Sequence, residues 1–147
     1  MNNSRAVIDS NIMVFSAIDT DQSPLAEALW RKLKKDSTAV YAPRLWVSEV
    51  TSGIHKYLFA KVITPEYADT AILSALKINI KFLDETPELC LSASHWATRL
   101  NQMAAYDGFY LAAAESLDAP LWTGDKRLVN TAMQLGLSWV HWMGDLE

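Results

Sequence analysis

The sequence has a single cysteine, no long apolar run and no excess of basic residues, and each shortage excludes a class of protein. Cys90 has no second cysteine to pair with in 147 residues, so an internal disulfide is impossible. We expect Cys90 to be a small buried hydrophobic residue rather than a nucleophile. No apolar run reaches the length of a membrane span, so no membrane partner is expected. The start of the chain lacks the pattern of a signal peptide, and these features together predict a cytoplasmic protein.

The charge and composition limit the function further. The net charge is −4 and the pI is about 5.3, unlike a basic module that binds nucleic acid nonspecifically. An acidic site that carries a metal ion is not excluded, because the bound ion reverses the local sign of charge. Apolar residues make up 50% of the chain and charged residues 20%, which is typical of a globular protein. With no linker, repeat or low-complexity tract, residues 1–147 are predicted to form one domain.

Strand-like apolar runs alternate with amphipathic, helix-like segments along the chain. The predicted strands are residues 6–8, 38–42, 78–83, 121–123 and 137–142. The predicted helices are residues 11–18, 25–35, 44–58, 65–76, 87–103, 108–117 and 126–135. This alternation indicates an α/β fold in which helices cover both faces of a parallel sheet.

Four acidic residues from separate segments are predicted to meet at one edge of that sheet. Asp9 and Asp125 follow the first and fourth strands directly or nearly so. Glu49 lies about one and a half turns into the helix after the second strand. Asp107 stands at the head of the helix that leads into the fourth strand. All four positions fall at the carboxyl edge, where parallel α/β sheets bind their ligands.

Carboxylates gathered in this way require a compensating charge. Two of them about 5 Å apart repel by roughly 3 kcal/mol at an effective dielectric near 20, and a whole domain is stable by only about 5–15 kcal/mol. Oxygen ligands without a cluster of histidine or cysteine favour Mg²⁺ or Mn²⁺. Our hypothesis is that Asp9 and Asp107 chiefly bind this ion, which activates a water, while Glu49 and Asp125 orient the water, hold outer-sphere waters or bind a second ion.

Each of these residues also has a purely structural interpretation. Asp9, Asp107 and Asp125 could cap the helices that they precede or begin. Glu49 could be a solvated residue on the flank of its helix. Lys126 and Arg127 could hold a neighbouring phosphate, although such a pair is more often a solvated helix start.

The local sequence resembles the PIN-domain nucleases, and within them the VapC-type toxins of bacterial type II toxin–antitoxin systems. The resemblance rests on four segments, in order and at suitable spacing: Val7–Asn11, Ala42–Val50, Ala105–Ala112 and Leu121–Leu128. Tyr-Asp-x-x-Tyr-Leu-Ala-x-Ala-Glu and Thr-x-Asp-Lys-Arg-Leu are the most specific parts of these segments and their continuations.

The resemblance implies a three-layer α/β/α sandwich with a five-stranded parallel sheet. It also implies a Mg²⁺- or Mn²⁺-dependent ribonuclease, a hydrolase that cleaves RNA and is often a homodimer inhibited by a cognate antitoxin. The family's metal-binding acids correspond to Asp9, Glu49, Asp107 and Asp125, and its supporting hydrogen-bonding positions to Asn11 and Thr123.

Two alternatives are compatible with the same residues. A phosphotransfer enzyme of the haloacid-dehalogenase type would use Asp9 as its nucleophile, but Asn11 stands where that family has a second Asp, and Glu49 would have no role. A non-catalytic PIN-like binding domain would not need all four acids.

Overall fold

A computed structural model describes residues 4–146 of the chain, within which it has five strands and seven helices. In chain order these are β1 (Arg5–Ile8), α1 (Ser10–Ala17), α2 (Ser23–Lys35), β2 (Ala39–Pro43), α3 (Leu45–Phe59), α4 (Pro65–Leu76), β3 (Lys81–Leu83), α5 (Pro87–Arg99), α6 (Tyr106–Leu117), β4 (Leu121–Thr123), α7 (Lys126–Gln134) and β5 (Val140–Trp142).

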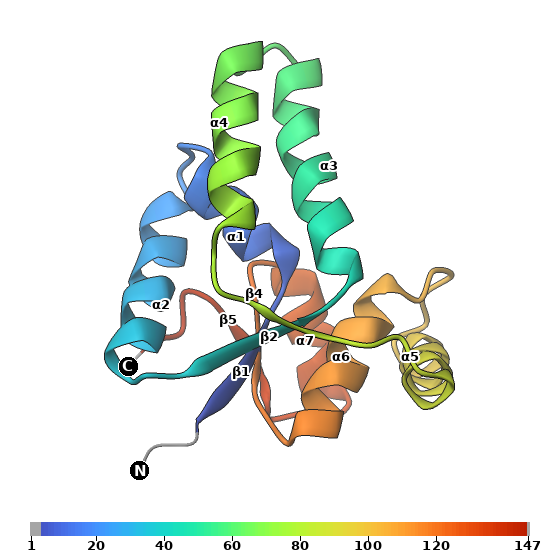
Figure 1. Ribbon diagram of the computed structural model, residues 1–147. Helices are drawn as coiled ribbons and strands as arrows, with labels where there is room; N and C mark the ends of the chain where they lie inside the picture. The colour runs from blue at the N-terminus through green and yellow to red at the C-terminus, as the bar shows by residue number, and fades with distance from the viewer. Residues whose placement is uncertain (1–3, 147) are drawn as a thin grey trace.

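The five strands form one parallel sheet in the order β3-β2-β1-β4-β5. The chain builds outward from β1 to β3 and then returns through α5 and α6 to place β4 on the other side of β1 (Figure 1). The strand order therefore reverses between β1 and β4. In open α/β sheets this reversal leaves a crevice beyond the carboxyl ends of the two strands.

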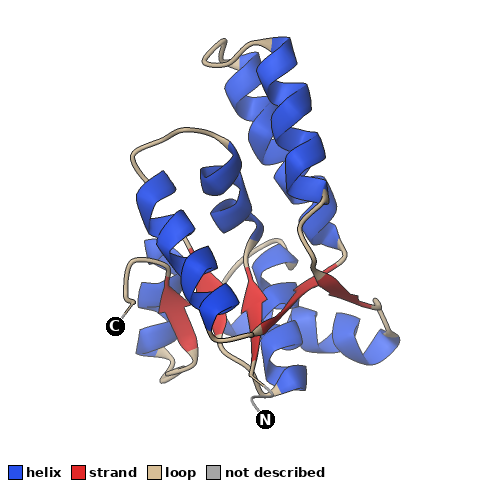
Figure 2. Ribbon diagram, turned by 60° about the vertical axis from the view of Figure 1, so that its left-hand side comes forward, coloured by secondary structure: helices blue, strands red, loops and turns tan. Residues whose placement is uncertain are grey.

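Two buried clusters of apolar side chains lie on opposite faces of the sheet, which confirms the three-layer arrangement. Val7 of β1 belongs to the larger cluster, with side chains of α6 and α7. Its neighbours Ala6 and Ile8 belong to the smaller cluster, with Leu29 and Leu33 of α2. Successive residues of a strand point to opposite faces, so β1 contributes to both clusters. Figure 2 shows the sheet between these helices.

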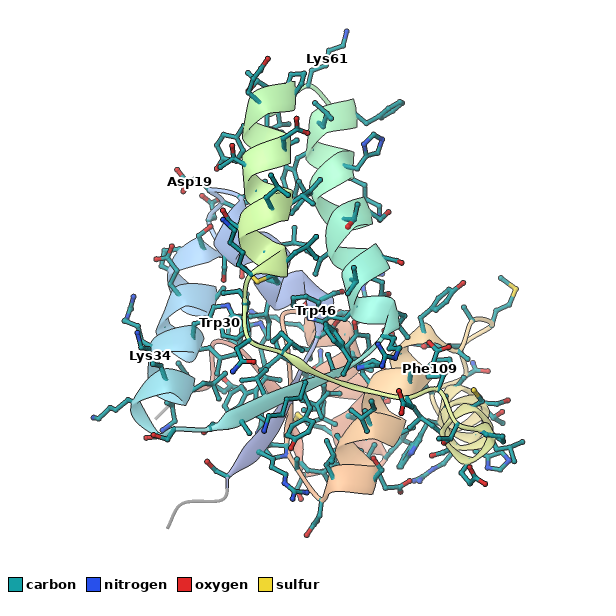
Figure 3. All side chains as sticks on the ribbon, in the orientation of Figure 1. Asp19, Trp30, Lys34, Trp46, Lys61 and Phe109 are labelled. Atoms are coloured by element: carbon teal, nitrogen blue, oxygen red, sulfur yellow. The ribbon has the colours of Figure 1, made fainter. Side chains whose placement is uncertain are left out.

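Helices α3 and α4 pack side by side and project as a hairpin beyond the carboxyl edge of the sheet (Figures 1 and 2). Trp46 lies where α3 meets the sheet and Lys61 lies at the far tip (Figure 3). The hairpin continues with α4, whose N-cap Thr64 accepts a hydrogen bond from the Tyr67 amide and precedes Pro65 at the first helical position. Glu49 lies in the first two turns of α3, directly after β2, and is therefore close to the sheet edge.

Several element boundaries differ from those predicted. The helix predicted over 87–103 ends at Arg99, because Asn101 adopts a left-handed conformation (φ 56°) and reverses the chain. The next helix consequently begins at Tyr106 rather than at residue 108. The third strand is only Lys81–Leu83, since β3 is an edge strand that pairs with β2 alone.

Two further predictions concern single features of the surface. Cys90 is exposed, so the prediction of a buried cysteine is wrong; it lies on the outer side of α5, whose inner side packs on α6. Among residues 4–146, no helix is long and apolar enough to cross a membrane.

Candidate active site

Polar side chains follow β1 and β4 at the carboxyl edge where the strand order reverses, the place at which open α/β sheets leave a crevice. The parallel register pairs Ile8 with Trp122, so the next residues along, Asp9 and Thr123, lie side by side. The Asp9 amide continues the ladder by donating to the Trp122 carbonyl at 2.9 Å. Asp9 is 6% exposed and Thr123 is fully buried, so the inner wall of the crevice is polar and almost dry.

Asp9 is held by neutral donors. Thr123 donates from Oγ1 to Asp9 Oδ2 at 2.8 Å, and Asn11 donates from Nδ2 to the same oxygen at 3.4 Å. Asn11 Oδ1 in turn accepts from the Gly124 amide at 2.9 Å, which ties α1 to the loop after β4. A Cβ at Gly124 would lie 2.8 Å from the Phe15 ring, so this close approach needs glycine. The Asp9 side chain makes no capping bond to α1, so the helix-cap interpretation does not account for it.

The buried carboxyl of Asp9 forms no ion pair with any residue in the described range 4–146. Among residues 4–146 the ion pairs are Lys32–Asp36 and Arg44–Asp84, both at the surface. Burial, together with the charges of Asp107 and Glu49, raises the pKa of Asp9 to about 7, against the opposing effect of its hydrogen bonds. A cation beside Asp9 would relieve this unfavourable electrostatic environment.

Glu49 reaches the same crevice from the base of α3 and is half-buried. The Tyr110 hydroxyl donates to Glu49 Oε1 at 2.6 Å, and Ser10 Oγ lies 3.4 Å from both this oxygen and Asp9 Oδ1. Burial raises the pKa of Glu49, and the charge of Asp107 adds to the rise. Glu49 is therefore not a solvated face residue.

Asp107 lies in the first turn of α6, inside the helix rather than at its N-cap. Gln102, on the exposed loop before α6, donates from Nε2 to Asp107 Oδ2 at 2.9 Å. Burial raises the pKa of Asp107, with a further contribution from the charge of Asp125. The electrostatic contacts thus link Asp107 to all three of the other acids.

Asp125 caps α7, as one of the two sequence interpretations allowed. Its Oδ1 accepts from the amides of Arg127 at 2.9 Å and Leu128 at 3.4 Å. The charge of Asp125 also raises the pKa of Asp107, so the capping role does not exclude an interaction between the two carboxyl groups. The ammonium of Lys126 lies 4.1 Å from the centre of the Trp142 ring, and Arg127 is exposed on the first turn of α7.

A groove of about 640 Å³ between α1 and α3 has Glu49 in its lining. Ser10, Asn11 and Glu49 form its polar end, and Phe15 and Tyr57 are part of its mostly apolar wall. Helices α1 and α3 pack closely at Gly53, where a Cβ would lie 2.6 Å from Val14 Cγ2. The groove therefore leads to the Glu49 end of the acidic cluster.

The chemistry of the donor set fits a hard divalent cation. All four predicted site acids are carboxylates, and the most buried of them, Asp9, has no ion pair within the part of the chain that the structure describes. Within residues 4–146, no three His, Cys, Asp or Glu side chains are clustered tightly enough to form a ready-made metal site. Each carboxylate is instead held by a donor of the protein, so binding requires small rotations. Mg²⁺ tolerates this arrangement, because it keeps several of its waters and needs only one or two direct carboxylate ligands.

Sequence reasoning did not assign roles to three of the residues that contact the acids. Tyr110 stands three positions after Asp107 on α6, a spacing that places both on one helix face and that could have singled it out. Ser10 directly follows Asp9 but has no distinctive spacing of its own. Gln102 fell inside the helix predicted to run to residue 103, so no sequence signal placed it beside Asp107.

The fold and the crevice define an α/β domain with a carboxylate-lined site at the reversal of strand order. Residues 6–133 match the family described as PIN domain, and the chain belongs to this family. The match confirms the family resemblance of the sequence segments, and it favours a PIN-like site over one of the haloacid-dehalogenase type. No curated protein sequence matches the chain.

Solved structures show the same fold at low sequence identity. VapC20 of Mycobacterium tuberculosis, described as a toxin that cleaves the sarcin–ricin loop, is 14% identical, with a TM-score of 0.60 over 81% of this chain and 87% of that one. FitAcB of Neisseria gonorrhoeae is 16% identical, with a TM-score of 0.63 over 96% and 99% of the two chains. VapBC2 of Rickettsia felis, solved with a DNA fragment of its promoter, is 12% identical, with a TM-score of 0.63 over 94% and 96%.

Proposed function

We propose that this protein is a metal-dependent endoribonuclease that acts as the toxin of a toxin–antitoxin pair. The observation that carries the proposal is the buried Asp9 at the strand-order reversal, which has no ion pair among residues 4–146 and whose pKa is raised by burial and by the charges of Asp107 and Glu49. Membership of the PIN domain family and the fold shared with VapC20 support nuclease chemistry.

In this proposal Asp9 and Asp107 hold Mg²⁺ or Mn²⁺, and Glu49 and Asp125 orient the water or bind a second ion. When bound, the ion polarises a phosphoryl oxygen of the RNA and lowers the pKa of water at the site. Thr123 and Asn11 keep the Asp9 carboxylate in place through their hydrogen bonds. Arg127, exposed at the start of α7, is placed to contact a neighbouring phosphate.

Lys126 is the second residue proposed to contact phosphate. Its ammonium rests against the Trp142 ring, so contact with a phosphate requires either that it leave the ring or that the strand pass over it. The groove between α1 and α3 offers a path along which part of the substrate could reach the acids.

The partners that we propose are a cognate antitoxin protein and a second copy of the chain, with the protein located in the cytoplasm and residues 1–147 forming one domain. The likeness to VapBC2, which was solved with a DNA fragment from its promoter, supports the proposal of a DNA-binding antitoxin partner. The neighbouring open reading frame provides a direct check. A small upstream gene for a DNA-binding protein would support the toxin role, and its absence would leave only the nuclease.

The test of catalysis is cleavage of a single-stranded RNA pool by the purified protein in Mg²⁺ or Mn²⁺, with chelation of the metal as the first control. We expect Asp9→Asn and Asp107→Asn to reduce the rate by at least roughly 100-fold, since each removes a direct ligand. Asp19→Asn is the matched control, because Asp19 is an exposed acid in the loop between α1 and α2 and points away from the body (Figure 3). Cleavage at the wild-type rate by both folded site variants would refute the mechanism.

The phosphotransfer alternative is tested on the same protein. Incubation with a phosphoryl analogue such as beryllium fluoride, followed by mass and structural analysis, would show an adduct on Asp9 if that residue were a nucleophile. We expect no adduct. Its appearance would replace hydrolysis by metal-activated water with aspartyl-phosphate chemistry.

A further inference from the structure

Glu49 differs from the other site acids in having a long, flexible side chain on a helix that projects beyond the sheet. Three side-chain torsions must be fixed before its carboxylate has a defined position. The α3–α4 hairpin does not itself supply a donor for this purpose. Among residues 4–146, the hydrogen bonds to the Glu49 carboxylate come from Tyr110 of α6 and Ser10 of α1, and both reach Oε1.

The two donors are not equivalent. The Tyr110 hydroxyl lies 2.6 Å from Glu49 Oε1, a short distance typical of a strong bond to a charged acceptor. Ser10 Oγ lies 3.4 Å from that oxygen and 3.4 Å from Asp9 Oδ1, and its single proton can serve only one of them at a time. Tyr110 is therefore the donor that sets the position of Glu49.

Tyr110 is well suited to hold another residue in place. It is 1% exposed and belongs to the main apolar cluster, on a helix that packs against β1, β2 and β4. It also stands one turn after Asp107 on α6, so the same rigid helix carries one acid and holds another. Helix α6 thus carries both Asp107 and the hydroxyl that holds Glu49.

A tyrosine hydroxyl can hold Glu49 without neutralising its charge, whereas a lysine at the same place would form an ion pair with it. A phenol hydroxyl is an uncharged donor at neutral pH, and the Tyr110 hydroxyl lies within hydrogen-bond distance of Glu49 Oε1. It therefore donates a hydrogen bond without cancelling the negative charge of Glu49. Among the described residues, no donor contacts the second oxygen, Oε2, which leaves that oxygen available to a cation or to one of its waters.

We propose that Tyr110 is a positioning residue of the nuclease site, whose hydroxyl holds Glu49 Oε1 so that Oε2 serves the metal. This inference rests on the proposed function, since it concerns the same carboxylates. It differs from a packing role, in which the ring alone would matter and loss of the hydroxyl would leave metal binding unchanged.

The test is a double-mutant cycle on Mn²⁺ affinity, measured by titration calorimetry and therefore independent of activity. Tyr110→Phe keeps the ring and removes the hydroxyl, and we expect it to weaken Mn²⁺ binding by roughly 10–100-fold, as loss of an outer-shell partner does. Glu49→Gln should weaken binding as well. If Tyr110 acts through Glu49, adding Tyr110→Phe to Glu49→Gln should change the affinity by less than about twofold, because the coupled residues are not additive. Tyr41→Phe, on β2, is the matched control and should bind Mn²⁺ like the wild type.

A second measurement needs no variant of Tyr110. The short bond to Glu49 should give the Tyr110 hydroxyl proton a downfield, slowly exchanging NMR signal in the wild type, and that signal should persist when Mg²⁺ is added. Its disappearance with Mg²⁺ would overturn the inference, as would wild-type Mn²⁺ affinity in Tyr110→Phe or additive losses in the cycle. In those cases the nuclease function stands. Failure of the wild type to bind Mn²⁺ would instead overturn the proposed function and this inference with it.

Discussion

Asp9 combines two properties that conflict in the metal-free protein, namely burial and negative charge. Its position beside Thr123 follows from the parallel register of β1 and β4, so the backbone places the carboxylate there whether or not a cation is present. A buried group of this kind lowers stability unless something compensates its charge. Function and stability therefore make opposite demands on this residue, which is the usual relation in active sites.

We predict that Asp9→Asn raises the melting temperature of the metal-free protein at pH 8 by at least about 2 °C. Asn has nearly the same shape and can still accept the hydrogen bond from Thr123, but it carries no charge. The pKa of Asp9 is about 7 in the folded protein, above its ordinary value of 3.8. Below pH 3.8 the neutral carboxyl does not destabilise the fold, and the protein loses stability as pH rises from there through about 7 and Asp9 becomes charged. The difference between the two proteins should therefore shrink at pH 4. Thermal melts in chelator at both pH values check this, and a lower melting temperature of the variant at pH 8 would contradict it.

Thr123 is the hydrogen-bonding centre of the crevice. Its fully buried hydroxyl donates to Asp9 and accepts from the Asp125 amide at 3.0 Å, so it connects the loops after β1 and β4. We predict that Thr123→Val, which keeps the shape, lowers the free energy of unfolding by about 1–3 kcal/mol, because it leaves buried polar groups unpaired. Urea denaturation measures this loss. Thr98→Val, on the exposed side of α5, is the control, and equal losses in the two variants would show that the buried Thr123 hydroxyl contributes no more to stability than an exposed one.

At the scale of whole elements, the strands and most helices were predictable because apolar periodicity and turn residues determine them locally. The boundary between α5 and α6 was not. Residues 100–105 include helix-forming residue types that hide the break, although Asn101 is of a type that adopts the left-handed conformation found there. The same applies to Tyr110: its spacing from Asp107 is visible in the sequence, but its contact with Glu49 depends on how α3 and α6 are placed by the sheet.

The packing of α5 on α6 leads to a prediction about Gly108. A Cβ at this position would lie 2.1 Å from the Ala93 carbonyl oxygen, a backbone atom that cannot move alone. We predict that Gly108→Ala lowers the free energy of unfolding by about 1–3 kcal/mol through overpacking. Because the two helices must separate at the residue next to Asp107, Mg²⁺ affinity should fall as well.

Gly53→Ala provides the comparison, since its Cβ would meet the side-chain tip of Val14 at 2.6 Å rather than a backbone atom. The loss of stability should be smaller in this variant. Denaturation curves for both variants, with Mg²⁺ titrations on each folded protein, check the prediction. A Gly108→Ala protein as stable as the wild type would mean that α5 and α6 can separate at no cost.

At the scale of the whole molecule, a bound divalent ion would offset part of the net charge of −4 as well as the charges of the four site carboxylates. The proposed ion binds a site assembled from the end of β1, α3, α6 and the N-cap of α7, and these segments are far apart in the unfolded chain. An ion that binds the folded state alone stabilises it by mass action, by about 1.4 kcal/mol at tenfold above its dissociation constant. A domain of this size should respond with a rise in melting temperature of roughly 3–6 °C.

We therefore predict that millimolar Mg²⁺ raises the melting temperature of the wild type, that chelation reverses the rise, and that Asp9→Asn and Asp107→Asn abolish it. Asp19→Asn should retain the full shift, because its carboxylate is in the exposed loop between α1 and α2. Matching the ionic strength with NaCl separates binding at the site from general screening of the negative charge. The comparison also decides between the two PIN-like interpretations: a catalytic site requires the shift and its dependence on Asp9 and Asp107, whereas a non-catalytic binding domain predicts wild-type and variant curves that Mg²⁺ leaves unchanged.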